Sequence, residues 1–214
     1  MIKRISLALG VAVVGSAALV ASRPSAYRTE RTRNLAAPAE IPFALVNDPH
    51  RWRLWSPWES PDSNTKRHFD GPFAGPDAVY SWVGNARVGK GRMTLLEARP
   101  YELIRVRLER FQPRPSTSTL VFTFQPTAEG VTLRWVQEGH LSFLDKAHAL
   151  FTDLEAKRGA DLEQGLNALS AVSEAEVGNR RERDALIKEH SEAKARRQQA
   201  PSPASDPPAA VPSP

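Results

Sequence analysis

Residues 102–111 read ELIRVRLERF, and this stretch decides the fold. Ile104, Val106 and Leu108 alternate with charged residues, and a period of two predicts a strand with one apolar and one solvated face. Similar runs separated by Gly, Pro or Asn lie on both sides of it, at 27–35, 66–70, 78–83, 91–98, 117–125 and 131–141. The links from 98 to 102 and from 125 to 131 are short, which predicts hairpins and therefore an antiparallel sheet.

After the last strand the apolar period becomes helical. One face of a helix from about Leu144 to Glu174 carries Phe143, Ala147, Leu150, Phe151, Leu154, Leu162, Leu166, Leu169 and Val172. Such a helix, roughly 45 Å long, can bury this face only across the sheet. We therefore expect an α+β fold with a curved sheet around a long C-terminal helix, and Leu154, Leu162 and Leu166 against its concave face. Two short helices predicted near 36–46 and 50–58 are too small to fill the wide end, so a cavity is expected there.

The N-terminal segment predicts membrane attachment. Lys3 and Arg4 precede 18 uncharged residues, Ile5–Ser22. This length is at the lower edge for a transmembrane helix, and it also fits a signal peptide cleaved after Ser22. We expect a single-pass anchor over residues 1–25 with the domain on the outer side of the cytoplasmic membrane. Cleavage would instead make the protein periplasmic or secreted.

The C-terminal segment predicts an appendage. Residues 200–214 contain six Pro in 15 positions, which excludes helix and sheet. Residues 174–199 are rich in Glu, Arg, Lys, Ala and Gln and predict a solvated, helical extension. We therefore divide the chain into residues 1–25, a domain at 26–174, and a tail at 175–214 that is a possible protein contact.

Composition excludes several classes of function. The chain of 214 residues has net charge +5, but residues 26–174 carry 19 basic and 18 acidic side chains, so no nucleic acid partner is expected. Cys is absent, and the five His show no metal-ligand spacing, so no metal or cofactor is expected.

Three stretches resemble a known superfamily. They are APAEIPFALVNDPHRWRLWSPW (37–58), the run from Gly71 to Leu108 with SWVGN and VGKG, and GADLEQGLNAL (159–169). They are similar to the START-like (SRPBCC) superfamily, in its polyketide cyclase/dehydrase branch, over about residues 27–174. The resemblance implies a helix-grip fold with a pocket for a hydrophobic small molecule. It implies activity only weakly.

The candidate ligand-binding residues are aromatic or polar groups expected near the wide end of the sheet: Trp55, Trp58, Trp82, Asn85, Trp135, Glu138 and Arg158. The alternative for the tryptophans is that they cover the hydrophobic core and that each indole N–H donates a hydrogen bond within the protein. The alternative for Asn85 is a turn residue, and for Glu138 a solvated strand end. Arg158 interrupts the apolar stripe between Leu154 and Leu162, so it either reaches the rim or pairs with Glu138 or Glu97. Inside a pocket it would bind an anionic head group.

These patterns predict membrane-tethered binding of a lipid, isoprenoid or polyketide-like compound. A cyclase/dehydratase-type enzyme that uses the same pocket is the alternative, and catalytic residues are not identified. A third possibility is an adaptor that binds a protein through its tail. A carboxylate–His or Arg–carboxylate pair deep in the pocket would favour the enzyme. An apolar pocket would favour the carrier, and a pocket closed by Trp side chains would favour the adaptor.

Overall fold

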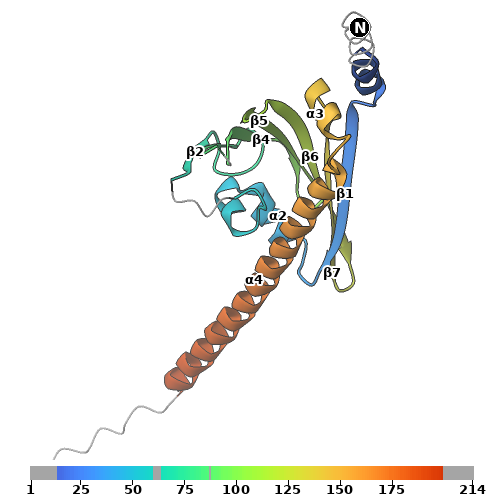
Figure 1. The fold of residues 1–214 in the computed structure, drawn as a ribbon. Coiled ribbons are helices and arrows are strands. Elements are labelled where there is room, and N and C mark those ends of the chain that lie inside the picture. Colours follow the sequence, from blue (N-terminus) through green and yellow to red (C-terminus); the bar gives the residue numbers. More distant parts are fainter. Residues whose placement is uncertain (1–13, 60–63, 87, 200–214) are drawn as a thin grey trace, which may run out of the picture. The chain divides into compact units, whose positions relative to one another are not determined.

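The computed structural model describes residues 14–59, 64–86 and 88–199. In these residues seven strands form one antiparallel sheet in the order β1-β7-β6-β5-β4-β3-β2. The strands are β1 (Ala26–Leu35), β2 (Lys66–Asp70), β3 (Val79–Val83), β4 (Lys90–Arg99), β5 (Leu103–Gln112), β6 (Ser116–Thr127) and β7 (Gly130–His140). The chain thus folds as a meander from β2 to β7, and β1 adds to the edge beside β7 (Figure 1).

The sheet bends around helices on one face. These are α2 (Glu40–Asn47), the 3₁₀ helix η1 (Pro49–Leu54), α3 (Phe143–His148) and the start of α4 (Leu154–Gln199) (Figure 1). The helix-facing side of β5 is apolar over Ile104, Val106 and Leu108, as alternation predicts, and each of these side chains is at most 1% exposed. The α+β helix-grip fold predicted from the sequence is therefore confirmed.

The helix predicted at 144–174 differs from the observed one in both bounds. A short α3 ends at His148, and α4 begins at Leu154 and continues to Gln199. The break has a local cause, because the Asp153 carboxylate accepts a hydrogen bond from the backbone N–H of Ala156 and thereby caps a new helix. Phe143 and Phe151, predicted on the buried face, are instead exposed, and Leu154 is half-buried.

The core contact between α4 and the sheet comes from three leucines. Leu162, Leu166 and Leu169 are each at most 2% exposed. Gly165 lies among them, and a Cβ there would lie 2.5 Å from Cζ3 of Trp135. The missing side chain at 165 is therefore what lets the helix approach the indole of β7.

The chain divides into two compact units, one up to Glu176 and one from Val177. The boundary falls within α4, and most side chains described from 177 to 196 are exposed. Within the described residues no helix has the length and apolar character needed to cross a membrane. Residues 14–22 are helical, and residues 1–13, which hold most of the predicted anchor, lie outside the described residues.

Candidate functional site

A cleft of about 330 Å³ opens between the ends of β5–β7, helix α3 and the first turns of α4. Its apolar part is formed by Tyr27, Trp58, Pro113, Leu141 and Leu154. Its polar part is formed by Arg110, Arg114, Ser116, Gln137, His140, Asp145, His148, Lys157, Arg158 and Asp161. The cleft is therefore amphipathic, with apolar walls and an excess of cationic side chains.

An aromatic cluster fills the hollow of the sheet next to this cleft. Trp55 packs edge-on against Phe122 and Trp135, with ring centroids 5.9 and 5.8 Å away. The indole N–H of Trp55 donates to the carbonyl of Leu45, and that of Trp52 donates to the carbonyl of Val46. These two bonds satisfy carbonyls in the last turn of α2 and hold η1 against it. The deep end of the expected cavity is therefore occupied by protein.

Two of the seven residues predicted to bind ligand line the cleft, Trp58 and Arg158. Trp58 follows η1, and its ring lies edge-on to Trp135 with centroids 5.4 Å apart. Arg158 lies in the second turn of α4 and reaches towards β1.

The structure places the other five outside the cleft. Trp55 and Trp135 belong to the core, at 4% and 0% exposure. Trp82 stacks on Tyr80 with centroids 5.8 Å apart. Asn85 holds the turn between β3 and β4, where its side-chain oxygen accepts from the backbone N–H of Val88.

Glu138 does not reach the cleft because of strand alternation. Its neighbour Gln137 lines the cleft, so Glu138 points to the opposite face of β7. There it forms an ion pair with Arg28 of β1.

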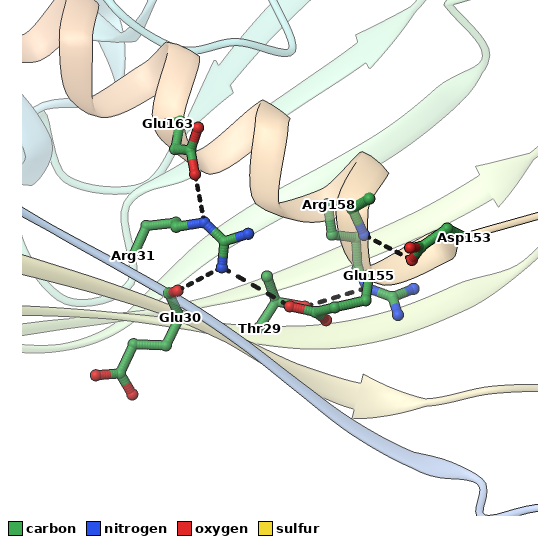
Figure 2. Close-up of polar contacts among 8 residues, drawn as sticks. Thr29, Glu30, Arg31, Asp153, Glu155, Arg158 and Glu163 are labelled. Carbon is green, nitrogen blue, oxygen red and sulfur yellow. Dashed lines mark hydrogen bonds and ion pairs between the residues drawn. The ribbon is translucent and has the colours of Figure 1, made fainter.

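Arg158 is held by contacts with β1 (Figure 2). Its Nε donates to Oγ1 of Thr29 at 3.3 Å, and Oγ1 in turn donates to Glu155. The guanidinium lies over the ring of Tyr27, 4.1 Å from the centroid. Neither carboxylate expected as its partner is in contact with it, since Glu138 pairs with Arg28 and Glu97 pairs with Arg99 and Arg105. Arg158 therefore reaches the cleft as a part-exposed cation.

Arg110 is one of the cleft residues that were not predicted from the sequence. It follows Ile104, Val106 and Leu108 by the same step of two, so it occupies the next position on the helix-facing side of β5. Extending that alternation by one more step would have found it. Burial lowers the pKa of Arg110, and the nearby Tyr27 and Asp161 partly oppose this shift.

A larger hollow of about 430 Å³ lies elsewhere, around Arg99, Glu102 and Arg134. Its cations already have partners, because Arg99 pairs with Glu97 and Glu102, and Arg134 pairs with Glu30. The cleft beside α3 is the stronger candidate, because its Arg110, Lys157 and Arg158 form no ion pair with a carboxylate in the described residues.

The family model for "Polyketide cyclase / dehydrase and lipid transport" matches residues 27–174. The chain therefore belongs to this family, within the START-like (SRPBCC) superfamily. No curated protein sequence matches the chain.

Solved structures show the same fold at low identity. A protein of unknown function from Staphylococcus aureus is 10% identical, with a TM-score of 0.57 over 73% of this chain and 98% of that one. The di-domain ARO/CYC protein StfQ of the steffimycin biosynthetic pathway is 14% identical, with a TM-score of 0.55 over 72% of this chain and 52% of that one. A protein from Mesorhizobium loti is 16% identical, with a TM-score of 0.50 over 68% and 95%. At these identities the likeness concerns the fold.

Proposed function

We propose that the domain binds a hydrophobic small molecule, such as a lipid, an isoprenoid or a polyketide-like compound, in the cleft beside α3. The observation that carries the proposal is the cleft itself. Its volume of about 330 Å³ lies within the range of small-molecule sites, roughly 300–1,000 Å³, and its walls are apolar at Trp58, Leu141 and Leu154. The description of the family, which includes lipid transport, supports the same proposal.

The polar groups of the cleft support binding more than proton transfer. Asp145 is occupied as the N3 residue of the capping box of α3, where it accepts from the hydroxyl and the backbone N–H of the N-cap residue Ser142. His148 lies 3.3 Å from the hydroxyl of Thr152. In the described residues no histidine of the cleft is hydrogen-bonded to a carboxylate, which is the pairing that acid–base catalysis uses.

A series of linear alcohols tests the binding proposal. Each methylene group removed from water contributes about 0.8 kcal/mol, so affinity for the full-length protein should rise about fourfold from one alcohol to the next. The affinity should stop rising once the alkyl chain of the alcohol fills the cleft. Calorimetry on heptanol, octanol, nonanol and decanol would measure it.

Two substitutions locate the site. Leu154→Asp places a charge in the apolar wall of the cleft, and an acidic residue is tolerated in the first turn of α4 because the helix dipole favours it there. This variant should bind the alcohols weakly. Leu144→Asp is the control, because Leu144 is 69% exposed and does not line the cleft. Equal loss in both variants, or binding that does not depend on chain length, would contradict the proposal.

We also propose that the N-terminal segment tethers the domain to a membrane, with the domain on the outer side. The uncharged run Ile5–Ser22 is the main support. A second support is the surface beside it, since Lys146 of α3 donates to the carbonyls of Ala21 and Arg23. The same region carries exposed apolar side chains at Phe143, Leu144 and Phe151, which are 47%, 69% and 89% exposed. Apolar groups next to the end of a membrane segment fit the interface of a bilayer.

Fractionation tests the tether. The full-length protein should stay with membranes after an alkaline wash, whereas Val14→Arg with Leu19→Arg should release it, because two charges make a short apolar segment too costly to insert. Recovery of the unchanged protein in the soluble fraction, with Met1 still present, would show that the segment is no anchor. Recovery without residues 1–22 would indicate a cleaved signal.

A further inference from the structure

We propose that the molecule bound in this cleft is anionic at one end, and that Arg110 and the indole N–H of Trp58 form the site for its acidic head group. This inference rests on the proposed binding function and specifies the class of ligand. It is carried by three observations on Arg110, on Trp58 and on the charges around them.

Arg110 is a cation at the end of an apolar row. The three residues before it on the same face of β5 are at most 1% exposed, so the strand leads from the core directly to the guanidinium. A charged group in such a position is costly unless an opposite charge or hydrogen-bond acceptors compensate it. The guanidinium cannot lose its proton at neutral pH, so it cannot avoid this cost as a lysine could.

The compensating partner is missing in the described residues. Arg110 makes no hydrogen bond and no ion pair there, and its contact is the ring of Trp58, whose centroid lies 5.7 Å from Cζ. Other arginines of the sheet are paired, for example Arg31 with Glu163 and Arg92 with Glu109. Asp161 faces Arg110 across the cleft without ion-pair contact. The N–H donors of Arg110 can therefore still bind acceptors supplied by a ligand.

Trp58 adds a second donor without an acceptor. Its Nε1 is buried and has no hydrogen-bond partner in the described residues. An indole N–H can only donate, and buried donors in folded proteins almost always have partners. The group that would satisfy Trp58 is therefore an acceptor, as is the group that would satisfy Arg110, and the two side chains are in contact.

The charges around the two residues favour an anion. Arg114 is paired with Asp145 at 3.4 Å, which leaves Arg110, Lys157 and Arg158 against Asp161 among the charged residues that line the cleft. A carboxylate or phosphate would supply both the negative charge and several acceptors, and a planar guanidinium binds either one in a bidentate manner. The apolar part of the ligand would then lie along Leu141 and Leu154.

Three probes with the same decyl chain test this inference: undecanoate, decyl phosphate and decanol. Calorimetry with the full-length protein should show that at least one of the two anions binds about ten- to a hundredfold more tightly than decanol, the range expected for hydrogen bonds to a charged group. The tighter of the two anions identifies the head group as carboxylate or phosphate.

Substitutions assign the preference to residues. Arg110→Met keeps the apolar stem and should abolish the preference for the anion while leaving decanol affinity within about twofold. Trp58→Phe keeps an aromatic ring in the wall of the cleft but removes the donor, so it should weaken the anions more than decanol. Arg158→Met should have a smaller effect, because Arg158 already bonds Thr29 and stacks on Tyr27. Arg107→Met, on the opposite face of the same strand and exposed, is the matched control and should change nothing.

The outcomes separate this inference from the proposed function. If decanol and both anions bind equally and Arg110→Met changes neither, the cleft binds ligand but the anion site is wrong. If none of the three binds, the proposed function fails first. Thermal unfolding without ligand gives an independent result: Arg110→Met should raise Tm by removing an uncompensated charge. A lower Tm would mean that the protein itself compensates Arg110, and would overturn the inference.

Discussion

Gly165 shows how closely a single residue sets the distance between helix and sheet. The side chain that it lacks would overlap the ring of Trp135, which is 0% exposed. The cleft depends on this contact indirectly, because Trp135 supports the ring of Trp58.

We predict that Gly165→Ala lowers the free energy of unfolding by about 1–3 kcal/mol, the usual cost of overpacking, although alanine favours the helix by about 1 kcal/mol. Gly178→Ala is the control, because a Cβ at 178 would have no atom within 4 Å. Urea denaturation of both variants measures the difference. A Gly165→Ala protein as stable as Gly178→Ala would mean that α4 and β7 are less closely packed than described.

At the residue scale, the sequence shows which segment carries aromatic side chains but not which of them face the core and which face the cleft. Trp55 and Trp58 are three residues apart in one aromatic segment, but one donates its N–H to α2 and the other lines the cleft. Only the three-dimensional path of the chain after η1 separates the two. Arg110, in contrast, was predictable, because the alternation of β5 continues through it.

At the scale of elements, the strands were predictable because alternation is local and each strand has one apolar face. The predicted bounds of β2 agree with the observed Lys66–Asp70, and the other strands differ by a few residues at most. The break between α3 and α4 was not predicted because apolar residues continue at helical spacing through it. The signal against a continuous helix was polar: Ser142 and Asp145 start α3, and Asp153 starts α4.

The buried stripe of α4 predicts where that helix contributes to stability. Leu162→Ala and Leu166→Ala should each lower the free energy of unfolding by about 2–5 kcal/mol, because both side chains are fully buried. Leu154→Ala should cost less, since Leu154 is half-buried in the cleft wall. Leu186→Ala, at a position 51% exposed, should stay within about 0.5 kcal/mol of wild type. Changes that small at Leu162 and Leu166 would refute the packing of α4 on the sheet.

Helix α3 is predicted to depend on pH through Asp145. Burial alone would raise the pKa of this carboxyl, but hydrogen bonds from Ser142 and the charge of Arg114 outweigh burial, so the pKa lies below its ordinary value. A carboxylate with a lowered pKa stabilises the fold above its unfolded pKa, and this contribution is lost as the pH falls through the folded pKa.

Asp145→Ala should therefore cost about 1 kcal/mol at neutral pH, the usual value of a helix cap, and less in strong acid. Urea unfolding of wild type and variant at neutral pH and near pH 2 would measure both differences. A cost that does not decrease in acid would show that the charge of Asp145 contributes nothing.

At the scale of the whole molecule, the division into two units predicts that the domain is stable without the C-terminal extension. Truncation after Glu176 should leave Tm nearly unchanged, because Val177 begins a separate compact unit and most of the side chains described there, at 177–196, are exposed. Calorimetry on the full-length and truncated proteins measures this. A large fall in Tm would show that the extension packs on the domain.

The position of Trp58 gives the protein a built-in optical reporter. All five tryptophans lie in described parts of the chain, and Trp58 is the one that lines the cleft. It lies beside a cation, and its N–H has no hydrogen-bond partner among the described residues. The emission of an indole responds to nearby charge and to hydrogen bonding. A molecule that enters the cleft should therefore change the intrinsic fluorescence of the protein, chiefly through Trp58, which lines the cleft. Trp58→Phe removes the response, so occupancy can be followed in the unlabelled protein whatever the chemical identity of the ligand.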